Sequence, residues 1–152
     1  MNTENIQNIY SLSPMQQGML FHSIFSPVTG TYVEQTNLNL NGPLNVDAFA
    51  HAWRTVVQRN PILRTAFVWE GVDEPVQVVL NDVDFDVQFE DWRGKSEQQR
   101  EQELNERLQQ DRQAGFELTE APLMRVMLFQ IENDLVASPL AAGRLVATFA
   151  VG

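Results

Sequence analysis

The pattern of apolar and polar positions predicts one helix most clearly, over residues 45–60. Apolar side chains recur there at three- and four-residue steps, and this spacing places them on one face of a helix. That broad apolar face carries Val46, Phe49, Ala50, Trp53, Val56 and Val57. The opposite stripe carries Asp47, His51, Arg54 and Gln58. Because Pro61 cannot continue a helix, we expect the helix to end before it and to bury one side.

A second helix is predicted over residues 96–115, and it is polar on nearly every side. Ser96 begins the stretch and Gln99 follows three residues later, which is the spacing of a capping box. Gly115 is the residue type that commonly stops a helix. Both ends of this helix are therefore marked in the sequence.

The surface of this polar helix has two interpretations. Leu104 and Leu108 form a narrow apolar seam, whereas Glu103 and Arg107 have the four-residue spacing of an ion pair. We interpret the stretch as a solvated surface helix. The alternative is a charge-patterned site for a protein partner.

The stretch SPMQQGMLFHS, residues 13–23, predicts the start of a third helix. Ser13 and Gln16 have capping-box spacing, and the proline after Ser13 is suited to the first helical position. Gly18 weakens the helix interior and leaves room for a close backbone approach. The helix should end before Pro27.

Further segments have the composition and the alternation of strands. They are residues 31–41, 65–71, 75–82, 85–92 and 122–131. In the fourth, we expect Phe85, Val87 and Phe89 to face inward, because alternate side chains of a strand point to opposite faces. The mixture of helices and strands predicts an α/β layered domain.

Composition narrows the function classes. The chain has 152 residues, which suits one domain with a real core, and a net charge of −10 with Lys95 as its single lysine. Such a chain should repel nucleic acid and anionic membranes. There are no cysteines, no visible secretion signal and no apolar run long enough to span a bilayer. These features favour a cytoplasmic protein.

Serine–histidine catalysis receives little support. The chain has two histidines. His22 shares a helical stripe with Met15 and Met19, where a packed imidazole is expected, and His51 lies on a polar stripe, where solvated pairing is expected. Ser13 is better explained as a helix cap. A nucleophilic serine needs a histidine within hydrogen-bond reach, oriented by a third group, and no such arrangement is predicted.

Metal binding, phosphate binding and acid/base chemistry receive equally little support from the sequence. No histidine cluster or calcium-loop spacing indicates a metal site, and no glycine-rich loop followed by lysine indicates a phosphate site. Asp84 and Asp86 share one strand face and are the candidate pair for acid/base chemistry, but any solvent-facing pair would have the same arrangement. We therefore predict no metal site.

Arg64 is flanked by apolar residues at the entrance to a predicted strand, within RNPILRTAFVWEG, residues 59–71. A buried guanidinium needs a carboxylate or several carbonyl groups, because an unpaired buried charge is costly. Alternatively, the side chain extends along apolar surface to reach water. The spacing alone leaves both open.

Two stretches resemble core motifs of a known family. YSLSPMQQGMLFHS, residues 10–23, resembles the first core motif of nonribosomal peptide synthetase condensation domains, in its peptide-elongating form. Residues 59–71 look like the second motif, of the type R-H-E-x-L-R-T-x-F. FELTEAPLMRVMLFQIEND, residues 116–134, is also similar to that family. The resemblance covers roughly residues 9–134.

The resemblance implies a fold and a set of site residues. Condensation domains have two lobes that are each like chloramphenicol acetyltransferase, and this chain would be most of the N-terminal lobe, an α/β sandwich with helices on a mixed sheet. The motif positions that are expected to be structural or to line the substrate tunnel are Ser13, Gln16, Gly18, Arg59, Arg64 and Thr65. Departures occur at Gly18 and Leu20 in the first motif and at Asn60-Pro61 in the second.

The family's third motif, H-H-x-x-x-D-G, is absent from the sequence. In the family it follows one strand after a segment like 122–134, and its second histidine assists the attacking amine. Its aspartate pairs with the arginine that Arg64 matches, so Arg64 lacks the partner that the resemblance implies. By carry-over, no catalytic residue can be named in this chain.

The resemblance also implies the activity and the partners. The family forms amide bonds between aminoacyl and peptidyl thioesters that are tethered by phosphopantetheine to carrier proteins. We expect a truncated condensation domain that is inactive alone, binds no cofactor directly, and has carrier proteins and adjacent synthetase domains as partners. One alternative is a non-catalytic interaction module. Another is an active acyltransferase of related fold that uses a different histidine.

The composition changes after Asp134. Residues 135–152 contain five alanines and no acidic residue. We divide the chain into residues 1–134, the N-terminal part of a condensation domain, and residues 135–152, a divergent or out-of-frame tail. The out-of-frame interpretation is favoured, and the alternative is a genuine strand over LVATFAVG, residues 145–152. A lone lobe should also expose an apolar patch and fold marginally.

Overall fold

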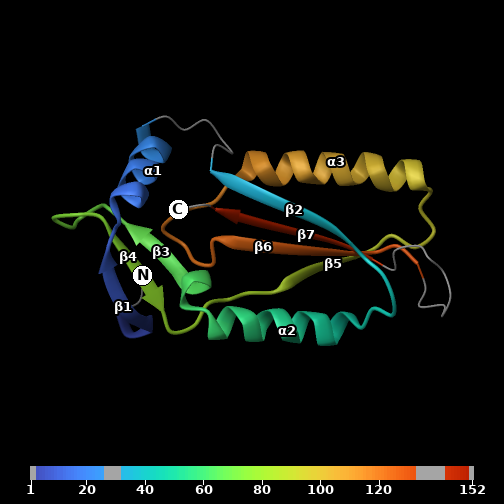
Figure 1. Cartoon of the computed structure of the whole chain (residues 1–152), viewed down its shortest axis with the longest axis horizontal. Coiled ribbons are helices and arrows are strands. Elements are labelled where there is room, and N and C mark those ends of the chain that lie inside the picture. The colour runs from blue at the N-terminus through green and yellow to red at the C-terminus, as the bar shows by residue number, and fades with distance from the viewer. Residues whose placement is uncertain (1–2, 26–31, 133–142, 151–152) are drawn as a thin grey trace.

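The computed structural model describes residues 3–25, 32–132 and 143–150. In chain order the elements are η1 (Thr3–Asn5), β1 (Ile6–Ser11), α1 (Pro14–Phe25), β2 (Val33–Leu40), α2 (Val46–Arg59), η2 (Pro61–Arg64), β3 (Thr65–Val68), β4 (Val76–Leu80), β5 (Val87–Asp91), α3 (Glu97–Ala114), β6 (Met124–Gln130) and β7 (Gly143–Ala150). Figure 1 shows the predicted α/β architecture, with long helices on the two sides of a sheet.

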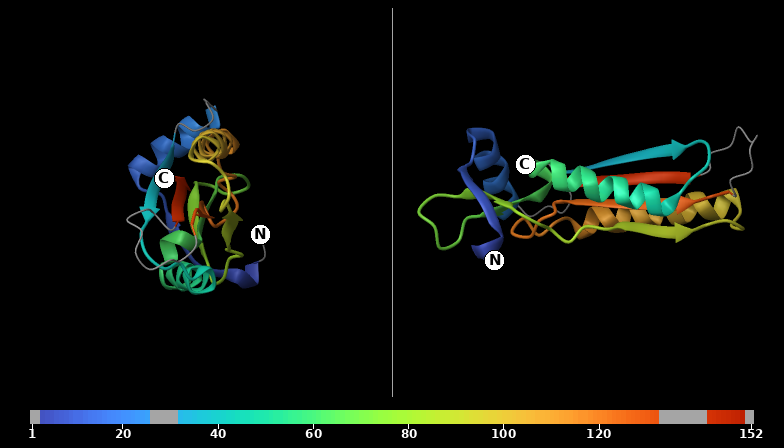
Figure 2. Two further views of the ribbon diagram at one scale, coloured as in Figure 1. Left: turned by 90° about the vertical axis from the view of Figure 1, so that its right-hand side faces the viewer. Right: turned by 90° about the horizontal axis from the view of Figure 1, so that it is seen from below.

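The larger sheet has four strands in the order β2-β7-β6-β5. β7 pairs antiparallel with β2 and with β6, whereas β5 runs parallel to β6, so the sheet is mixed as expected. Helix α2 lies along one face and α3 along the other, and both views in Figure 2 are consistent with this layering.

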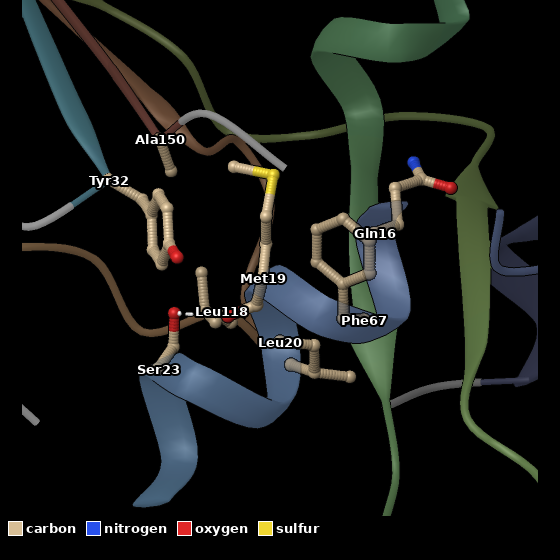
Figure 3. A pocket seen from close by; sticks show the side chains of 8 residues that line it. All are labelled: Gln16, Met19, Leu20, Ser23, Tyr32, Phe67, Leu118 and Ala150. Atoms are coloured by element: carbon tan, nitrogen blue, oxygen red, sulfur yellow. Dashed lines mark hydrogen bonds between the residues drawn. The ribbon is translucent and has the colours of Figure 1, made fainter. Parts of the chain in front are cut away.

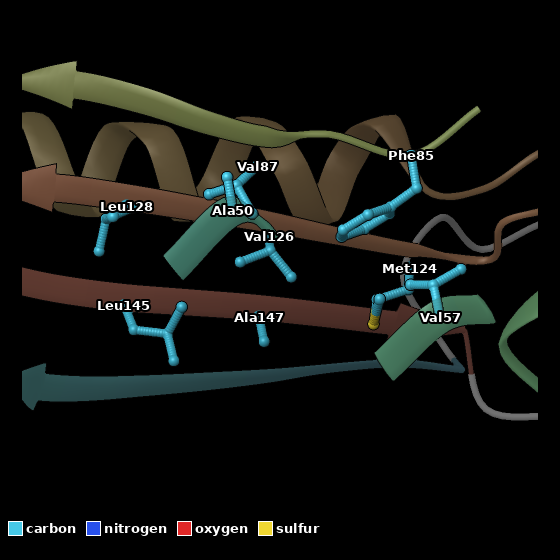
Figure 4. Packing of buried hydrophobic residues seen from close by; sticks show 9 residues of the cluster. All are labelled: Ala50, Val57, Phe85, Val87, Met124, Val126, Leu128, Leu145 and Ala147. Atoms are coloured by element: carbon cyan, nitrogen blue, oxygen red, sulfur yellow. The ribbon is translucent and has the colours of Figure 1, made fainter. Parts of the chain in front are cut away.

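The face under α2 holds the main apolar core. Ala50 and Val57 of α2 pack on alternate residues of β6 and β7, among them Val126, Leu128 and Ala147 (Figure 4). The helix begins after Asn45, whose side chain accepts a hydrogen bond from the Ala48 amide at 2.9 Å. The amphipathic pattern in the sequence therefore correctly predicted the helix that covers this face.

The face under α3 combines a small apolar core with ion pairs. Leu104 is 1% exposed and packs with Trp92, Met127, Phe129 and Val146. Around this core, cationic and anionic groups of α3 and the sheet pair off, namely Arg107 with Glu90, Arg144 with Glu101, and Arg125 with Asp111. The Ser96–Gln99 capping box is confirmed. Helix α3 is thus a surface helix fixed to the sheet at its edges.

Two predictions about polar contacts and strand faces were wrong. Glu103 does not pair with Arg107 along α3, because Lys95 binds Glu103 and Glu90 of β5 binds Arg107. Phe89, which was expected to be buried on the same face as Val87, is 42% exposed. β5 is an edge strand of the sheet, so the end of its inner face lies partly open.

A second sheet of three strands, in the order β1-β4-β3, lies beside α1. Leu12, Leu20 and Phe67 form the apolar contact between this sheet and the helix. β1 was not predicted, because its residues are mostly exposed and show no clear alternation. Within the described ranges, no helix is long and apolar enough to cross a membrane.

Residues 143–150 form β7 at the centre of the larger sheet, which is the arrangement that the alternative interpretation of the tail expected over 145–152. Gly143 suits this position, since a Cβ there would meet the Leu44 side chain at 3.0 Å and the Phe129 carbonyl at 3.2 Å. The stop at Pro27 and residues 133–142 and 151–152 lie outside the described residues. The domain boundary at residue 134 and the frame shift stay predictions.

Candidate functional site

The start of α1 is built by its two polar motif residues. The Ser13 hydroxyl accepts a hydrogen bond from the Gln16 amide at 3.2 Å, and the Gln16 side chain accepts one from the Ser13 amide at 2.9 Å. The Gln16 side-chain amide also lies 3.4 Å from that of Gln77 on β4. The capping box is confirmed, and it orients α1 against the smaller sheet.

A small cavity of about 30 Å³ lies beside α1 (Figure 3). Gln16, Met19 and Ser23 of α1 border it, together with Tyr32, Phe67 and Ala150. The Ser23 hydroxyl donates a hydrogen bond to the Met19 carbonyl at 2.9 Å. The Phe67 amide donates to the Leu118 carbonyl at 2.8 Å, which fixes that wall. The cavity therefore joins α1, β3 and the end of β7.

A second cavity, of about 170 Å³, shares Phe67 and Ala150 with the first. Its other walls include Ile62 and Leu63 of η2 and Leu123, which immediately precedes β6. The Ala150 amide donates a hydrogen bond to the Leu123 carbonyl at 3.0 Å. The two cavities are neighbours around the carboxyl end of β7.

Arg64 is 4% exposed, which excludes the interpretation in which it reaches water. Its Nη1 donates to the Gln7 side chain at 3.0 Å, to the Asn81 carbonyl at 3.3 Å and to the Leu80 carbonyl. All three acceptors are neutral. Its Nε is buried and has no hydrogen-bond partner among the described residues. Such a group costs about 1–3 kcal/mol, so the guanidinium is held but not fully satisfied.

The remaining motif positions fall in different places. Thr65 is buried, and its hydroxyl donates to the Pro61 carbonyl at 2.9 Å. Arg59 is exposed at the end of α2. Gly18 leaves room for a close backbone approach, but none is found, because a Cβ there would meet nothing within 4 Å. Gln16 and Thr65 thus border the two cavities, and Gly18 and Arg59 do not.

Neither histidine is placed as a catalytic base. His22 was expected to pack, but it is exposed and makes an edge contact with Tyr32 at a ring-centroid distance of 5.7 Å. The expected stripe was wrong because Leu20, not Met15, is the buried residue of α1. His51 is exposed on α2 as expected. In the described part of the chain, no three His, Cys, Asp or Glu side chains gather as a metal site would need.

One carboxyl group has a strongly lowered pKa, and it lies on the surface at the end of β5. Hydrogen bonds from the Arg93 side chain and backbone lower the pKa of Asp91 from 3.8 to about 2. Asp91 borders neither of the two cavities. The shift therefore reports a local surface pair and not a catalytic acid.

Sequence reasoning missed several of these residues. Gln7, which binds Arg64, lies on the unpredicted strand β1. Ala150 lies in the segment that was interpreted as a tail. No short motif marks either one, since each acts through its position in a sheet. Only the strand-like run at residues 145–152 could have indicated that the segment enters the fold.

Comparison with known proteins identifies the family. The condensation-domain family matches residues 6–137. A linear gramicidin synthase protein of Brevibacillus parabrevis is 47% identical over 130 residues, which cover 86% of this chain and 2% of that protein. Gramicidin S synthase 2 of Brevibacillus brevis is 35% identical over 127 residues, which cover 84% and 3%.

The solved structures agree on the fold. The first condensation domain of the calcium-dependent antibiotic synthetase, in complex with a substrate analogue, is similar with a TM-score of 0.80 and 15% identity, over 96% of this chain and 34% of that one. The chain therefore belongs to the condensation-domain family and has part of its chloramphenicol-acetyltransferase-like fold. It spans about a third of that solved chain and a few per cent of the curated relatives it matches.

Proposed function

We propose that this chain is the N-terminal lobe of a condensation domain, whose complete form joins two carrier-tethered thioesters through an amide bond, and that the chain alone is inactive. The proposed inactivity rests on one observation: both histidines are exposed, and neither is among the residues that line the two cavities at the end of β7. We place the protein in the cytoplasm with the adjacent domains of a synthetase.

We infer that the groups that assist the reaction lie outside this chain. The α-amine nitrogen of the acceptor attacks the thioester carbonyl carbon of the donor, a C–N bond forms, the C–S bond breaks, and the leaving thiolate takes up the proton that the amine gives up. The amine must be neutral, and negative charge develops on the carbonyl oxygen, so a base and a hydrogen-bond donor assist the step. In our proposal both lie in the absent H-H-x-x-x-D-G motif.

The surroundings of Arg64 support the proposal that it pairs with a carboxylate that this chain does not supply. A buried guanidinium whose printed acceptors are neutral, and whose Nε has no hydrogen-bond partner among the described residues, is suited to one further, negatively charged partner. We assign that partner to the aspartate of the absent motif. Because Arg64 borders neither cavity, we treat it as a structural residue and not a catalytic one.

A chimera tests the proposed function. The chain would replace the matching segment in a condensation domain of the 47% identical linear gramicidin synthase protein, with the third motif and second lobe retained. We expect amide-bond formation on loaded carrier proteins by the chimera and none by the chain alone. A version with both motif histidines changed to alanine is the control. Turnover by the chain alone, or a folded but inactive chimera, would refute the proposal.

A second candidate function, a non-catalytic module that binds carrier proteins, is favoured by the outer side of α1. Met15, Phe21 and Phe25 are 76%, 63% and 68% exposed, and apolar exposure of this extent marks contact surfaces. Binding of the chain to a phosphopantetheinylated carrier would be measured by calorimetry. We expect Phe21→Ser to weaken binding and Phe89→Ser, on the distant strand β5, to leave it unchanged; no binding by the unaltered chain would end this candidate.

A further inference from the structure

The cavity of about 170 Å³ has a lining that suits an apolar occupant. Ile62, Leu63 and Phe67 line it from η2 and β3. Met124 of β6, Phe149 of β7 and Leu123, the residue before β6, complete the apolar lining. Thr65 is the polar residue of the lining, and its hydroxyl already donates to the Pro61 carbonyl. The cavity therefore offers little to water, which needs two or more polar partners.

We propose that this cavity is the side-chain pocket for an aminoacyl substrate, and that it selects an apolar side chain of phenyl or branched-aliphatic size. The proposal rests on the condensation function proposed above and names the substrate class for it. It adds Leu123, Met124 and Phe149 as residues that determine specificity.

The size of the occupant follows from the volume. An apolar protein cavity of about 150 Å³ accepts one benzene molecule. A cavity of about 170 Å³ accepts a phenyl ring or a leucine side chain, but not two fused rings. A mismatch of one methylene in such a pocket changes affinity by about 10- to 200-fold, so the walls can discriminate between substrates.

The position of the cavity suits an amphipathic ligand. The first cavity, which shares Phe67 and Ala150 with the larger one, adds the polar groups of Gln16, Ser23 and Tyr32. An aminoacyl group has a polar amide and thioester part next to its side chain. With the side chain in the larger cavity, the polar part would lie towards α1.

The walls are fixed before any ligand arrives. Backbone hydrogen bonds join Ala150 to Leu123 at 3.0 Å and Phe67 to Leu118 at 2.8 Å, so both shared walls belong to the hydrogen-bonded framework. Met124 and Phe67 are 2% and 8% exposed. A pocket held in this way loses little conformational freedom when it binds.

Binding of fluorobenzene to the 152-residue chain, followed by ¹⁹F NMR, is the first test. We expect saturable binding that Leu123→Phe weakens at least tenfold, since the larger ring occupies the pocket. Leu38→Phe is the matched control, because Leu38 lies on β2 and is 50% exposed. Leu123→Ala should admit 2-fluoronaphthalene, which the unaltered chain excludes.

A second variant keeps the test interpretable if Leu123→Phe does not fold. Ile62 lines the cavity but is 66% exposed, so Ile62→Trp narrows the entrance without changing the core. It should weaken fluorobenzene binding in the same direction as Leu123→Phe. Absence of saturable binding to the unaltered chain, or equal binding by the folded variants, would overturn the proposal.

Competition separates this inference from the proposed function. N-acetyl methylamides of leucine and phenylalanine should displace fluorobenzene, and that of aspartate should be at least tenfold weaker, because a buried carboxylate is costly. Equal displacement by all three refutes the selectivity. An inactive chimera together with selective displacement would refute only the condensation function, and an active chimera without displacement would refute only the pocket.

Discussion

Truncation of Val146 at the centre of β7 tests whether this strand belongs to the core. Val146 is fully buried and packs with Trp92, Leu104, Met127 and Phe129 under α3. The change Val146→Ala removes two methyl groups, each worth about 0.8 kcal/mol of transfer free energy. The cavity left behind raises the loss of unfolding free energy to about 2–3 kcal/mol.

Urea unfolding followed by far-UV circular dichroism measures this loss. With a denaturant slope of about 2 kcal/mol per molar, the midpoint should fall by roughly 1 M. Val56→Ala is the matched control, because Val56 is 41% exposed on α2 and alanine is the better helix former. Its effect should stay within about 0.5 kcal/mol. If both variants unfold at the same midpoint, β7 is not packed between β2 and β6, and the reasoning fails.

Three further predictions concern single positions. Gly18→Ala should raise the free energy of unfolding by about 0.5–1 kcal/mol in a urea titration, because Gly18 lies inside α1 and an added Cβ meets open space; a loss would show a hidden contact. Gly143→Val should lower the thermal midpoint, since its side chain meets Leu44 and the Phe129 carbonyl, and an unchanged midpoint would contradict this close packing. The Asp91 carboxyl should titrate near pH 2 by NMR and return towards 3.8 in Arg93→Gln. Because the folded pKa is lowered, its stabilising contribution is present above pH 3.8 and lost as the pH falls through about 2.

Elements with strong local signals could be predicted from the sequence. The helix predicted over residues 45–60 is α2, Val46–Arg59, because its wide apolar face can be buried only when it is turned toward the sheet. The capping boxes at Ser13 and Ser96 were correct, since a cap depends on residues only three apart. β1 was missed because its stability comes from pairing with β4, which is distant in sequence.

The candidate site was predicted less completely than the fold. The motifs indicated Gln16, Arg64 and Thr65, but not which neighbours they have. The cavities depend on Ala150 and Phe149, which reach this region only because β7 is inserted between β2 and β6. His22 was misplaced because two methionines on its stripe suggested burial, whereas the short helix α1 buries Leu20 instead.

The position of β7 also affects how the chain folds while it is being synthesised. β2 pairs with β7 along its whole length, from Val33 opposite Ala150 to Leu40 opposite Gly143. During translation, β2 therefore leaves the ribosome about a hundred residues before the strand that it pairs with. Until β7 is made, the sheet between α2 and α3 is incomplete. The edge of β6 that later pairs with β7 is unpaired, and it can form hydrogen bonds with a wrong strand. Expression yield should therefore depend on whatever protects this nascent chain, such as a chaperone, and not only on the stability of the finished fold.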